Sequence, residues 1–345
     1  MSARFRELFV DASVRSEAVA QRRDASLRSG SIDHFFHYHG LEQTRRWLGV
    51  HRAHAPRFAQ PDLDRPYHEL AAKVAALAPG SDVVAFGPGA GSKERMVLAA
   101  LGAQGGRPRY LPVDASVELA LLSADAAQGV AAAPIVPLVG ELELAPDLPD
   151  WLDRRWGERA RIVTAFGIAP NLLPSRFFPL LAAVLRPHDW LLVSANLAPL
   201  AAGAPDDAAA YRAACAGVAA QYDNPETLYW LSCILEEWGL AALLEPVSFR
   251  IEPLEEIDAF VAATRWRSDT DLRWEGRPFA ARAGGELRLF YSLRYTVRRF
   301  EAQLQRCGLG VEQRAIDPTG QEGVWIARRT APVEHRPAHR VGKPA

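Results

Sequence analysis

Cysteine is scarce in this chain of 345 residues: only Cys215, Cys233 and Cys307 occur, and they form no Cys-x-x-Cys pair. Three widely spaced thiols argue against a disulfide framework and a thiolate metal site, and they are typical of a reducing compartment. No apolar run approaches the roughly 18 residues of a membrane span. The N-terminus also lacks an apolar core followed by a cleavage site. We therefore expect a cytoplasmic protein with no membrane partner.

An excess of charge of one sign is missing too, because 40 Lys and Arg residues face 41 Asp and Glu residues, for a formal net charge of −1. Such a chain has no global field that attracts a polyanion, which argues against a nucleic-acid partner. The Arg-rich stretch "QRRDASLR" is interpreted as a solvated helix face. With 49% hydrophobic and 23% charged residues, the composition is ordinary for a globular protein. We expect a monomer with one large or two medium domains.

Patterns for nucleophilic catalysis and metal binding are also lacking. The sequence shows no Ser-x-Gly nucleophile elbow and no Cys/His arrangement of the kind that hydrolases use. Histidines gather in "HFFHYHG" (34–40) and at His51 and His54, but "HFFHYHG" lacks the i, i+4 repeat of a helical metal site. We interpret these histidines as surface or pocket-lining residues and expect no metal.

Short apolar runs alternate with helical patterns through the middle of the chain. The five runs are residues 82–86, 109–114, 133–142, 160–167 and 189–197. Strands that recur with helices between them predict an α/β fold with a parallel sheet and right-handed crossovers. A helix "VRRFEAQLQRCG" and the strands "GVEQRAID" and "GVWIARR" would complete this sheet.

The pattern changes after the fifth run, where helical and alternating segments replace the regular repeat. We predict one domain from residues 76–197 plus 297–330. Residues 1–75 plus 198–296 would lie outside the sheet and form a second, substrate-binding or lid domain. The proline-rich tail, residues 331–345, is expected to be disordered because it has little apolar content.

A glycine-rich loop, "GPGAGSK", follows the first predicted strand. Glycine lets the backbone approach a ligand, and the following helix offers free N–H groups. A Walker A loop would end in Gly-Lys-Ser/Thr, but here Ser92 precedes Lys93. A dinucleotide fingerprint reads G-x-G-x-x-G, whereas Gly87, Gly89 and Gly91 are spaced G-x-G-x-G. The tighter spacing favours the S-adenosylmethionine loop of Rossmann-like methyltransferases, since no pyrophosphate has to fit.

Asp114 ends the second predicted strand, in "YLPVDAS". A carboxylate at this strand tip is placed to accept hydrogen bonds from both hydroxyls of a ribose. The alternative is a plain tight turn followed by an N-capping aspartate. Together with the glycine loop, the pattern predicts a nucleoside-binding α/β enzyme and favours a methyltransferase.

Six stretches occur in the same order as in a known family: "AFGPGAGSKE", "YLPVDAS", "TAFGIAPNLLP", "QYDNPE", "YSLRYT" and "GVWIARR". Together they resemble the histidine-specific S-adenosylmethionine-dependent methyltransferases, which include the histidine Nα-methyltransferases of the ergothioneine pathway. The resemblance covers roughly residues 25–330. It implies a Rossmann-like class I methyltransferase sheet. A second α+β domain, formed by the N-terminus and an insertion, would enclose a free amino acid.

The resemblance also implies a site for S-adenosylmethionine. Its residues would be Gly87, Gly89, Gly91, Lys93, Asp114, Glu141 and Leu142. Asp114 matches the acid that binds the ribose. The pair in "VGEL" would bracket the adenine, with Glu141 where an aspartate is usual.

For the methyl acceptor, the resemblance implies catalytic and binding roles for Asn171 and Tyr222. Asn171 in "FGIAPNLLP" matches an asparagine that holds the α-amino acid group, and Tyr222 in "QYDNPE" matches the tyrosine that assists it. An aromatic contact from the N-terminal segment would come from His37 or Tyr38.

The acceptor pocket departs from the family pattern at Phe290. Ser292 matches the serine of an acid-x-serine pair that binds the imidazole of histidine, but Phe290 replaces the acid. An N–H group left without its partner costs about 1–3 kcal/mol. We therefore expect a methyltransferase for the amine of an amino acid or a similar small molecule other than histidine. The alternatives are a peptide or specialised-metabolite acceptor, an inactive nucleoside-binding homologue, and an NAD-dependent oxidoreductase, for which no proton-relay residue is found.

Overall fold

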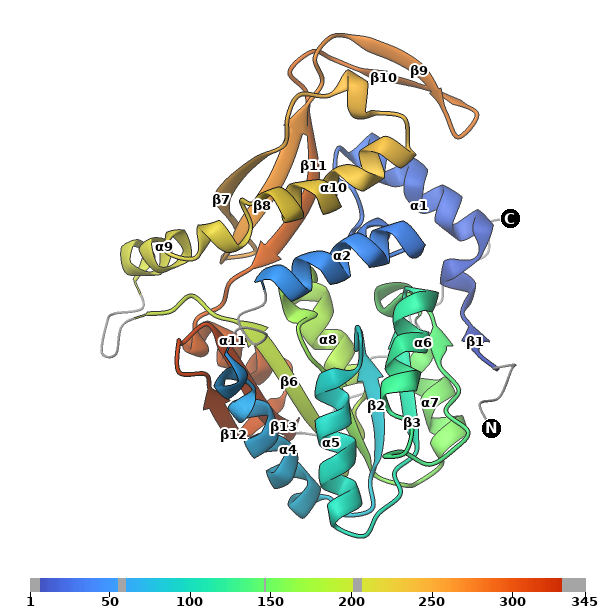
Figure 1. Ribbon diagram of the computed structural model, residues 1–345, viewed down its shortest axis with the longest axis vertical. Helices are drawn as coiled ribbons and strands as arrows, with labels where there is room; N and C mark the ends of the chain where they lie inside the picture. The colour runs from blue at the N-terminus through green and yellow to red at the C-terminus, as the bar shows by residue number, and fades with distance from the viewer. Residues whose placement is uncertain (1–6, 55–59, 146, 201–206, 331–345) are drawn as a thin grey trace, which may run out of the picture.

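The structure is a computed structural model that describes residues 7–54, 60–145, 147–200 and 207–330. The lower half of Figure 1 holds an eight-stranded sheet of order β1-β4-β3-β2-β5-β6-β13-β12. Its strands are β1 (Phe9–Val10), β2 (Asp82–Phe86), β3 (Tyr110–Asp114), β4 (Leu138–Val139), β5 (Arg161–Ala165), β6 (Trp190–Asn196), β12 (Leu309–Ile316) and β13 (Glu322–Arg329). The strands from β1 to β6 are parallel, and β13 runs antiparallel to both β6 and β12. The predicted parallel, Rossmann-like sheet is thus confirmed.

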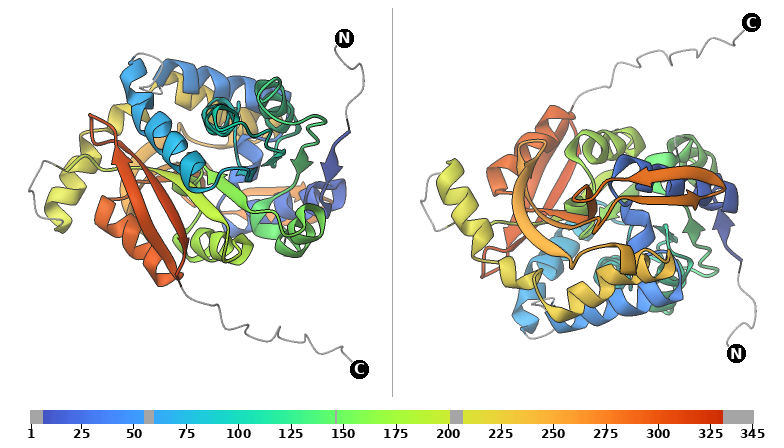
Figure 2. Two further views of the ribbon diagram at one scale, coloured as in Figure 1. Left: turned by 90° about the horizontal axis from the view of Figure 1, so that it is seen from below. Right: turned by 90° about the horizontal axis from the view of Figure 1, so that it is seen from above.

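Helices cover both faces of this sheet (Figure 2). They are α4 (Arg65–Leu77), α5 (Ser92–Ala103), α6 (Val117–Ala126), α7 (Leu148–Trp156), α8 (Pro174–Val184) and α11 (Val297–Arg306). Successive side chains of a strand point to opposite faces. Accordingly, Val83 and Ala85 of β2 pack with α4 and α5, whereas Val84 and Phe86 pack with α7 and α8. Because both faces are covered, β2 is an uninterrupted apolar run after Asp82.

Two expectations about the sheet need correction. The predicted strand over 133–142 is paired only at Leu138–Val139, since Pro134 and Pro137 have no N–H to donate. Residues before 75 were expected outside the sheet, yet β1 extends it beside β4, with the Phe9 N–H donating to the Pro137 carbonyl at 2.8 Å. A two-residue strand is too short to show an alternating pattern.

A second layer lies above the carboxyl ends of the parallel strands (Figure 1). Its sheet has the order β11-β8-β7 and is antiparallel, and a separate hairpin pairs β9 with β10. These strands are β7 (Ser248–Leu254), β8 (Ile257–Arg265), β9 (Thr270–Trp274), β10 (Arg277–Ala281) and β11 (Glu286–Leu293). Its helices are α1 (Ser16–Ser29), α2 (Leu41–His54), α9 (Ala208–Ala216) and α10 (Pro225–Glu237). The layer is thus α+β and built from the N-terminal segment and the later insertion; the exact domain boundaries stay a prediction.

Short 3-10 helices connect these elements: η1 (Ala12–Val14), η2 (His34–His37), η3 (Pro61–Asp64), η4 (Leu142–Leu144), η5 (Ala169–Asn171), η6 (Ala219–Gln221) and η7 (Ala241–Leu243). Helix α2 joins the two layers, because the Thr44 hydroxyl lies 3.1 Å from that of Ser116, the N-cap of α6. Helix α2 also packs against α10. These two helices together are called the roof. The site described below lies under this roof. The predicted disordered tail, 331–345, lies outside the described residues.

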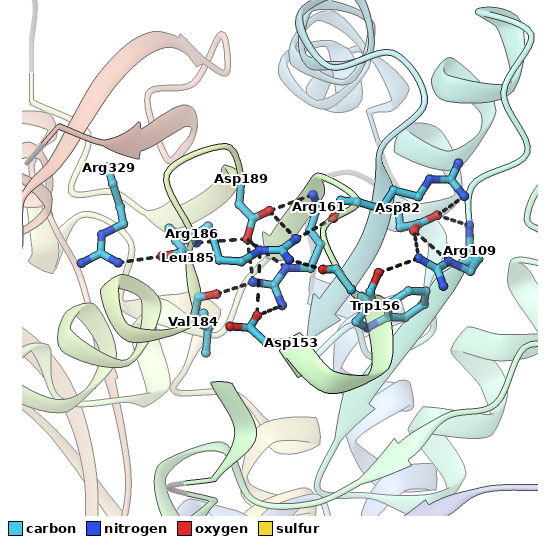
Figure 3. Close-up of polar contacts among 12 residues, drawn as sticks. Asp82, Arg109, Asp153, Trp156, Arg161, Val184, Leu185, Arg186, Asp189 and Arg329 are labelled. Atoms are coloured by element: carbon cyan, nitrogen blue, oxygen red, sulfur yellow. Dashed lines mark hydrogen bonds and ion pairs between the residues drawn. The ribbon is translucent and has the colours of Figure 1, made fainter. Parts of the chain in front are cut away.

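Ion pairs with buried carboxylates join the opposite, amino-terminal ends of the strands (Figure 3). Arg161 at the start of β5 pairs with Asp189 just before β6 at 2.6 Å, and both side chains are fully buried. Arg109, whose side chain is 38% exposed, pairs with the buried Asp82 at the start of β2, also at 2.6 Å. These contacts hold the strand starts together, at the end of the sheet away from the roof.

Candidate active site

A cavity of about 890 Å³ is lined by residues at the carboxyl ends of the parallel strands and by residues of the second layer. Ligands of α/β sheets bind at this end, and the volume is in the range of small-molecule and cofactor sites. Predicted site residues that line it are Tyr38, Gly87, Gly89, Lys93, Asp114, Glu141, Leu142, Asn171, Tyr222, Phe290 and Ser292. Gly91 is the predicted residue that does not line the cavity.

The glycine loop joins β2 to α5 with Gly87, Gly89 and Gly91 in left-handed conformations. A Cβ at Gly91 would lie 2.8 Å from the Cα of Ser123, so this glycine permits the close packing of α5 on α6. A Cβ at Gly89 would lie 3.0 Å from the Trp47 ring. Helix α2 therefore covers the loop directly.

Lys93 lies in the first turn of α5, at the edge of the cavity. Its ammonium donates to the Glu322 carboxylate at 2.8 Å and also contacts the Tyr67 hydroxyl. The Tyr67 ring lies 4.2 Å from the ammonium. A carboxylate thus neutralises the charge of Lys93, and its role in holding the methyl donor stays a prediction.

Asp114 ends β3, and its side chain is buried at the cavity wall. Its carboxylate accepts the Ser116 N–H at 2.9 Å, and the Gly89 N–H also donates to it. Burial raises its pKa to about 7, against the opposing effect of these N–H groups. A desolvated carboxylate that faces a cavity gains from hydroxyl donors. The arrangement therefore fits a ribose diol.

Glu141 precedes η4 and faces Arg22 of α1, whose Nη1 lies 3.3 Å from its carboxylate. Burial, and then the nearby Asp33, raise the pKa of Glu141 to about 7, while Arg22 opposes them. The interpretation of "QRRDASLR" as a solvated face is wrong for Arg22, which is 7% exposed. No local signal could show this, because its partner lies far away in the sequence.

Asn171 at the end of η5 donates from Nδ2 to the Tyr38 hydroxyl at 2.9 Å. Burial raises the pKa of Tyr38, so this hydroxyl keeps its proton. Of the two candidates in the N-terminal segment, Tyr38 lines the cavity. His37 is buried behind it and donates from Nε2 to the Leu289 carbonyl at 2.6 Å.

Tyr222 and Ser292 form a second polar pair, with their hydroxyl oxygens 3.0 Å apart. The Tyr222 ring stacks on Phe260 with centroids 4.2 Å apart, which fixes its orientation. Arg294 lines the same wall. Its place in "YSLRYT" could have shown this, because Ser292 and Arg294 are two residues apart and point to one face.

Phe290 lies where the resemblance would place an acid, and its ring is buried among aromatic side chains. It stacks on His34 with ring centroids 4.7 Å apart and meets Trp230 at 5.3 Å. The Tyr291 N–H donates to Nε2 of His34 at 3.2 Å. Burial, with help from His37 and Arg288, lowers the pKa of His34 well below its usual value, so its ring is neutral. The rings that contact Phe290 are thus aromatic and carry no charge.

Neither a metal centre nor a membrane helix is found in the described part of the chain. Within residues 7–54, 60–145, 147–200 and 207–330, no group of three or more His, Cys, Asp or Glu side chains could hold a metal ion. Over the same ranges, every helix is too short or too polar to cross a bilayer.

The sheet, the glycine loop and the carboxylate at the tip of β3 define a Rossmann-like methyltransferase. A family profile described as "Histidine-specific methyltransferase, SAM-dependent" matches residues 65–329. The chain belongs to this family, as the resemblance implied, and is an enzyme that uses S-adenosylmethionine. A search of curated protein sequences gave no match.

Solved structures of other methyltransferases are similar at low identity. The CcbJ methyltransferase from Streptomyces caelestis is 16% identical, with 79% of this chain and 97% of that chain covered and a TM-score of 0.38. The magnesium protoporphyrin IX methyltransferase ChlM from Synechocystis PCC 6803, with bound SAH, is 12% identical, with coverages of 85% and 97% and a TM-score of 0.40. The mitomycin 7-O-methyltransferase MmcR is 15% identical, with coverages of 92% and 69% and a TM-score of 0.42.

The residues of the cavity fit the methyl donor. The buried carboxylate of Asp114 would hold its ribose, the backbone of the glycine loop would lie against it, and Glu141 and Leu142 would bracket its adenine. When bound, S-adenosylmethionine supplies an electrophilic methyl group on a sulfonium. The ring of Trp47 lies against Gly89 of the loop and lines the same cavity.

Proposed function

We propose that the protein methylates the amine of an amino acid or of a similar small molecule. The observation that carries this proposal is the presence of two polar pairs, Asn171 with Tyr38 and Tyr222 with Ser292, on the wall of the cavity that the glycine loop also lines. Together they offer hydroxyl donors and an amide oxygen, which suit an ammonium and a carboxylate on one carbon.

The chemistry asks little of the chain beyond positioning. The amine must present a neutral lone pair in line with the methyl group, and alignment with exclusion of water can supply up to about 7–11 kcal/mol of a barrier. In this proposal the amide oxygen of Asn171 accepts an amine N–H and so directs the lone pair. Tyr222 orients the amino acid portion of the acceptor and assists removal of the amine proton.

Histidine is a poor acceptor in this proposal. An imidazole N–H would meet the ring of Phe290 in place of a carboxylate, and the neutral His34 behind that ring offers no compensating charge. An unpaired N–H costs about 1–3 kcal/mol. An apolar or aromatic side chain fits the same wall without this cost.

A transfer assay tests the proposal. The protein is incubated with methyl-labelled S-adenosylmethionine and, separately, with each free amino acid and with short peptides that carry the same side chains. We expect labelling of a free amino acid other than histidine and a strong loss of rate in Asn171→Ala and Tyr222→Phe. Labelling of peptides alone would favour the peptide acceptor. Donor binding without any transfer would favour an inactive homologue.

A further inference from the structure

Arg294 follows β11 and carries a cation into the wall of the cavity. It is 4% exposed. Its Nε donates to the Tyr222 hydroxyl at 3.0 Å, its Nη1 to the Leu197 carbonyl at 3.1 Å, and its Nη2 to Oε1 of Gln221 at 2.7 Å. Each of these three acceptors is neutral.

The charge of Arg294 is not balanced by a carboxylate. Arg22 and Arg161 are buried to a similar degree, and each pairs with acidic side chains. Among the residues that the structure describes, none places a carboxylate oxygen at ion-pair distance from Arg294. The backbone N–H of Arg294 donates to the backbone carbonyl of Asp258. The carboxylate of Asp258 pairs with Arg212 at 3.0 Å.

Burial of a cation without a carboxylate partner lowers the stability of the folded protein. Neutral acceptors satisfy its N–H groups but leave its positive potential in the cavity. That potential favours a ligand with a negative group near Tyr222 and Ser292. Arg294 also donates to the oxygen of Tyr222, and such a charged donor strengthens the next hydrogen bond that the phenol O–H makes.

We propose that Arg294 recognises a carboxylate of the methyl acceptor, acting through the hydroxyls of Tyr222 and Ser292. The inference rests on the proposed function and narrows its substrate class to amines that also carry a carboxylate. Arg294 is a positioning residue here, because it acts through Tyr222 and does not touch the reacting amine. The methyl donor has a carboxylate of its own, and the test separates the two sources.

The test compares each accepted amino acid with its decarboxylated amine, for example phenylalanine with phenethylamine, by kcat/KM. In the unchanged protein we expect the amino acid to be preferred by about tenfold or more, since a hydrogen bond supported by a charge is stronger than one between neutral groups. Arg294→Gln should lose most of this preference through a higher KM for the amino acid, and Arg294→Lys should retain part of it. The preference is a ratio within one preparation, so partial unfolding does not affect it.

Arg212→Gln is the matched control. Arg212 is on α9, its side chain is half exposed, and it also lies near Asp258; the preference should stay as in the unchanged protein. The dissociation constant of S-adenosylhomocysteine, measured by calorimetry, should be the same in Arg294→Gln. If Arg294→Gln binds S-adenosylhomocysteine more weakly and keeps its preference for the amino acid, Arg294 contacts the methyl donor and the inference is overturned.

Two further outcomes separate this inference from the proposed function. If the unchanged protein methylates phenethylamine and phenylalanine with equal kcat/KM, the role of Arg294 is refuted and amine methylation stands. If no amine of either kind is labelled, the proposed function fails, and the inference fails with it.

Discussion

Two buried carboxylates, Asp114 and Glu141, line the predicted donor site, and burial raises the pKa of each to about 7. Each is therefore partly protonated near neutral pH when the cavity holds no ligand. Hydrogen bonds from ribose hydroxyls and from the adenine amino group favour the ionised forms. Binding of the donor should thus release protons and strengthen as the pH rises.

The affinity for S-adenosylhomocysteine should fall as the pH drops from 8 to 6. The loss can reach about tenfold per pH unit for each carboxylate that must ionise, with a plateau above the pKa values. Asp114→Asn should bind more weakly at high pH and show a shallower slope, because Glu141 alone still titrates. Calorimetry across this range measures both effects. Equal slopes in the two proteins would exclude Asp114 from the ribose contact.

Phe290→Glu should make histidine a better acceptor. The new carboxylate can accept an imidazole N–H, which we expect to raise kcat/KM for histidine by about tenfold. It should also lower the melting temperature, because it buries a carboxylate among the rings of His34 and Trp230. Phe290→Leu keeps the wall apolar and should bring no such gain. An equal rate with histidine in both variants would contradict the assigned role.

At the scale of elements, the β2–loop–α5 unit was predictable because both its apolar run and its glycines are local features. The contacts that require those glycines were not predictable, since Trp47 and Ser123 approach the loop from α2 and α6. The same limit applies to Arg22 and Glu141, which meet across the two layers. Sequence patterns report periodicity and turn chemistry, and they carry little information on distant partners.

Gly91→Ala should destabilise the fold. The residue adopts φ +75°, and a Cβ would lie 2.8 Å from the Cα of Ser123, so the backbones of α5 and α6 would have to separate. We expect a loss of about 1–3 kcal/mol in the free energy of unfolding. A Cβ at Gly102 of α5 meets no heavy atom within 4 Å. Gly102→Ala should therefore raise the free energy of unfolding by about 0.5–1 kcal/mol. Urea denaturation of both variants checks the contrast, and an unchanged stability for Gly91→Ala would refute it.

In the whole molecule, the ion pairs expected to stabilise the fold and the cavity expected to bind ligands lie at opposite ends of the main sheet. The strand starts are held by ion pairs with the buried carboxylates of Asp82 and Asp189 (Figure 3), and the glycine loop and Asp114 at the strand ends line the cavity. The parallel sheet was predictable from its repeated apolar runs. The addition of β1 was not predictable, because a strand of two residues is too short to show an alternating pattern in the sequence.

Arg161→Met should therefore lower stability without changing the donor site. Removing Arg161 leaves Asp189 with Arg186 at 3.1 Å, so we expect a loss of about 3 kcal/mol, at the lower end for a broken buried pair. The exposed pair of Arg328 and Glu312 serves as the control, and Arg328→Met should change stability by no more than about 1 kcal/mol. The folded fraction of each variant should bind S-adenosylhomocysteine as the unchanged protein does. A weaker binding constant in Arg161→Met would show that the two ends are coupled.

The most direct test of the central claim is the position of the transferred methyl group. The protein is incubated with S-adenosylmethionine labelled with carbon-13 in the methyl group and with the free amino acid that it labels best, and the product is read by NMR. We expect the label to be bonded to the α-amino nitrogen. A label on oxygen, carbon or a side-chain nitrogen, or its absence from every free amino acid, would contradict the account.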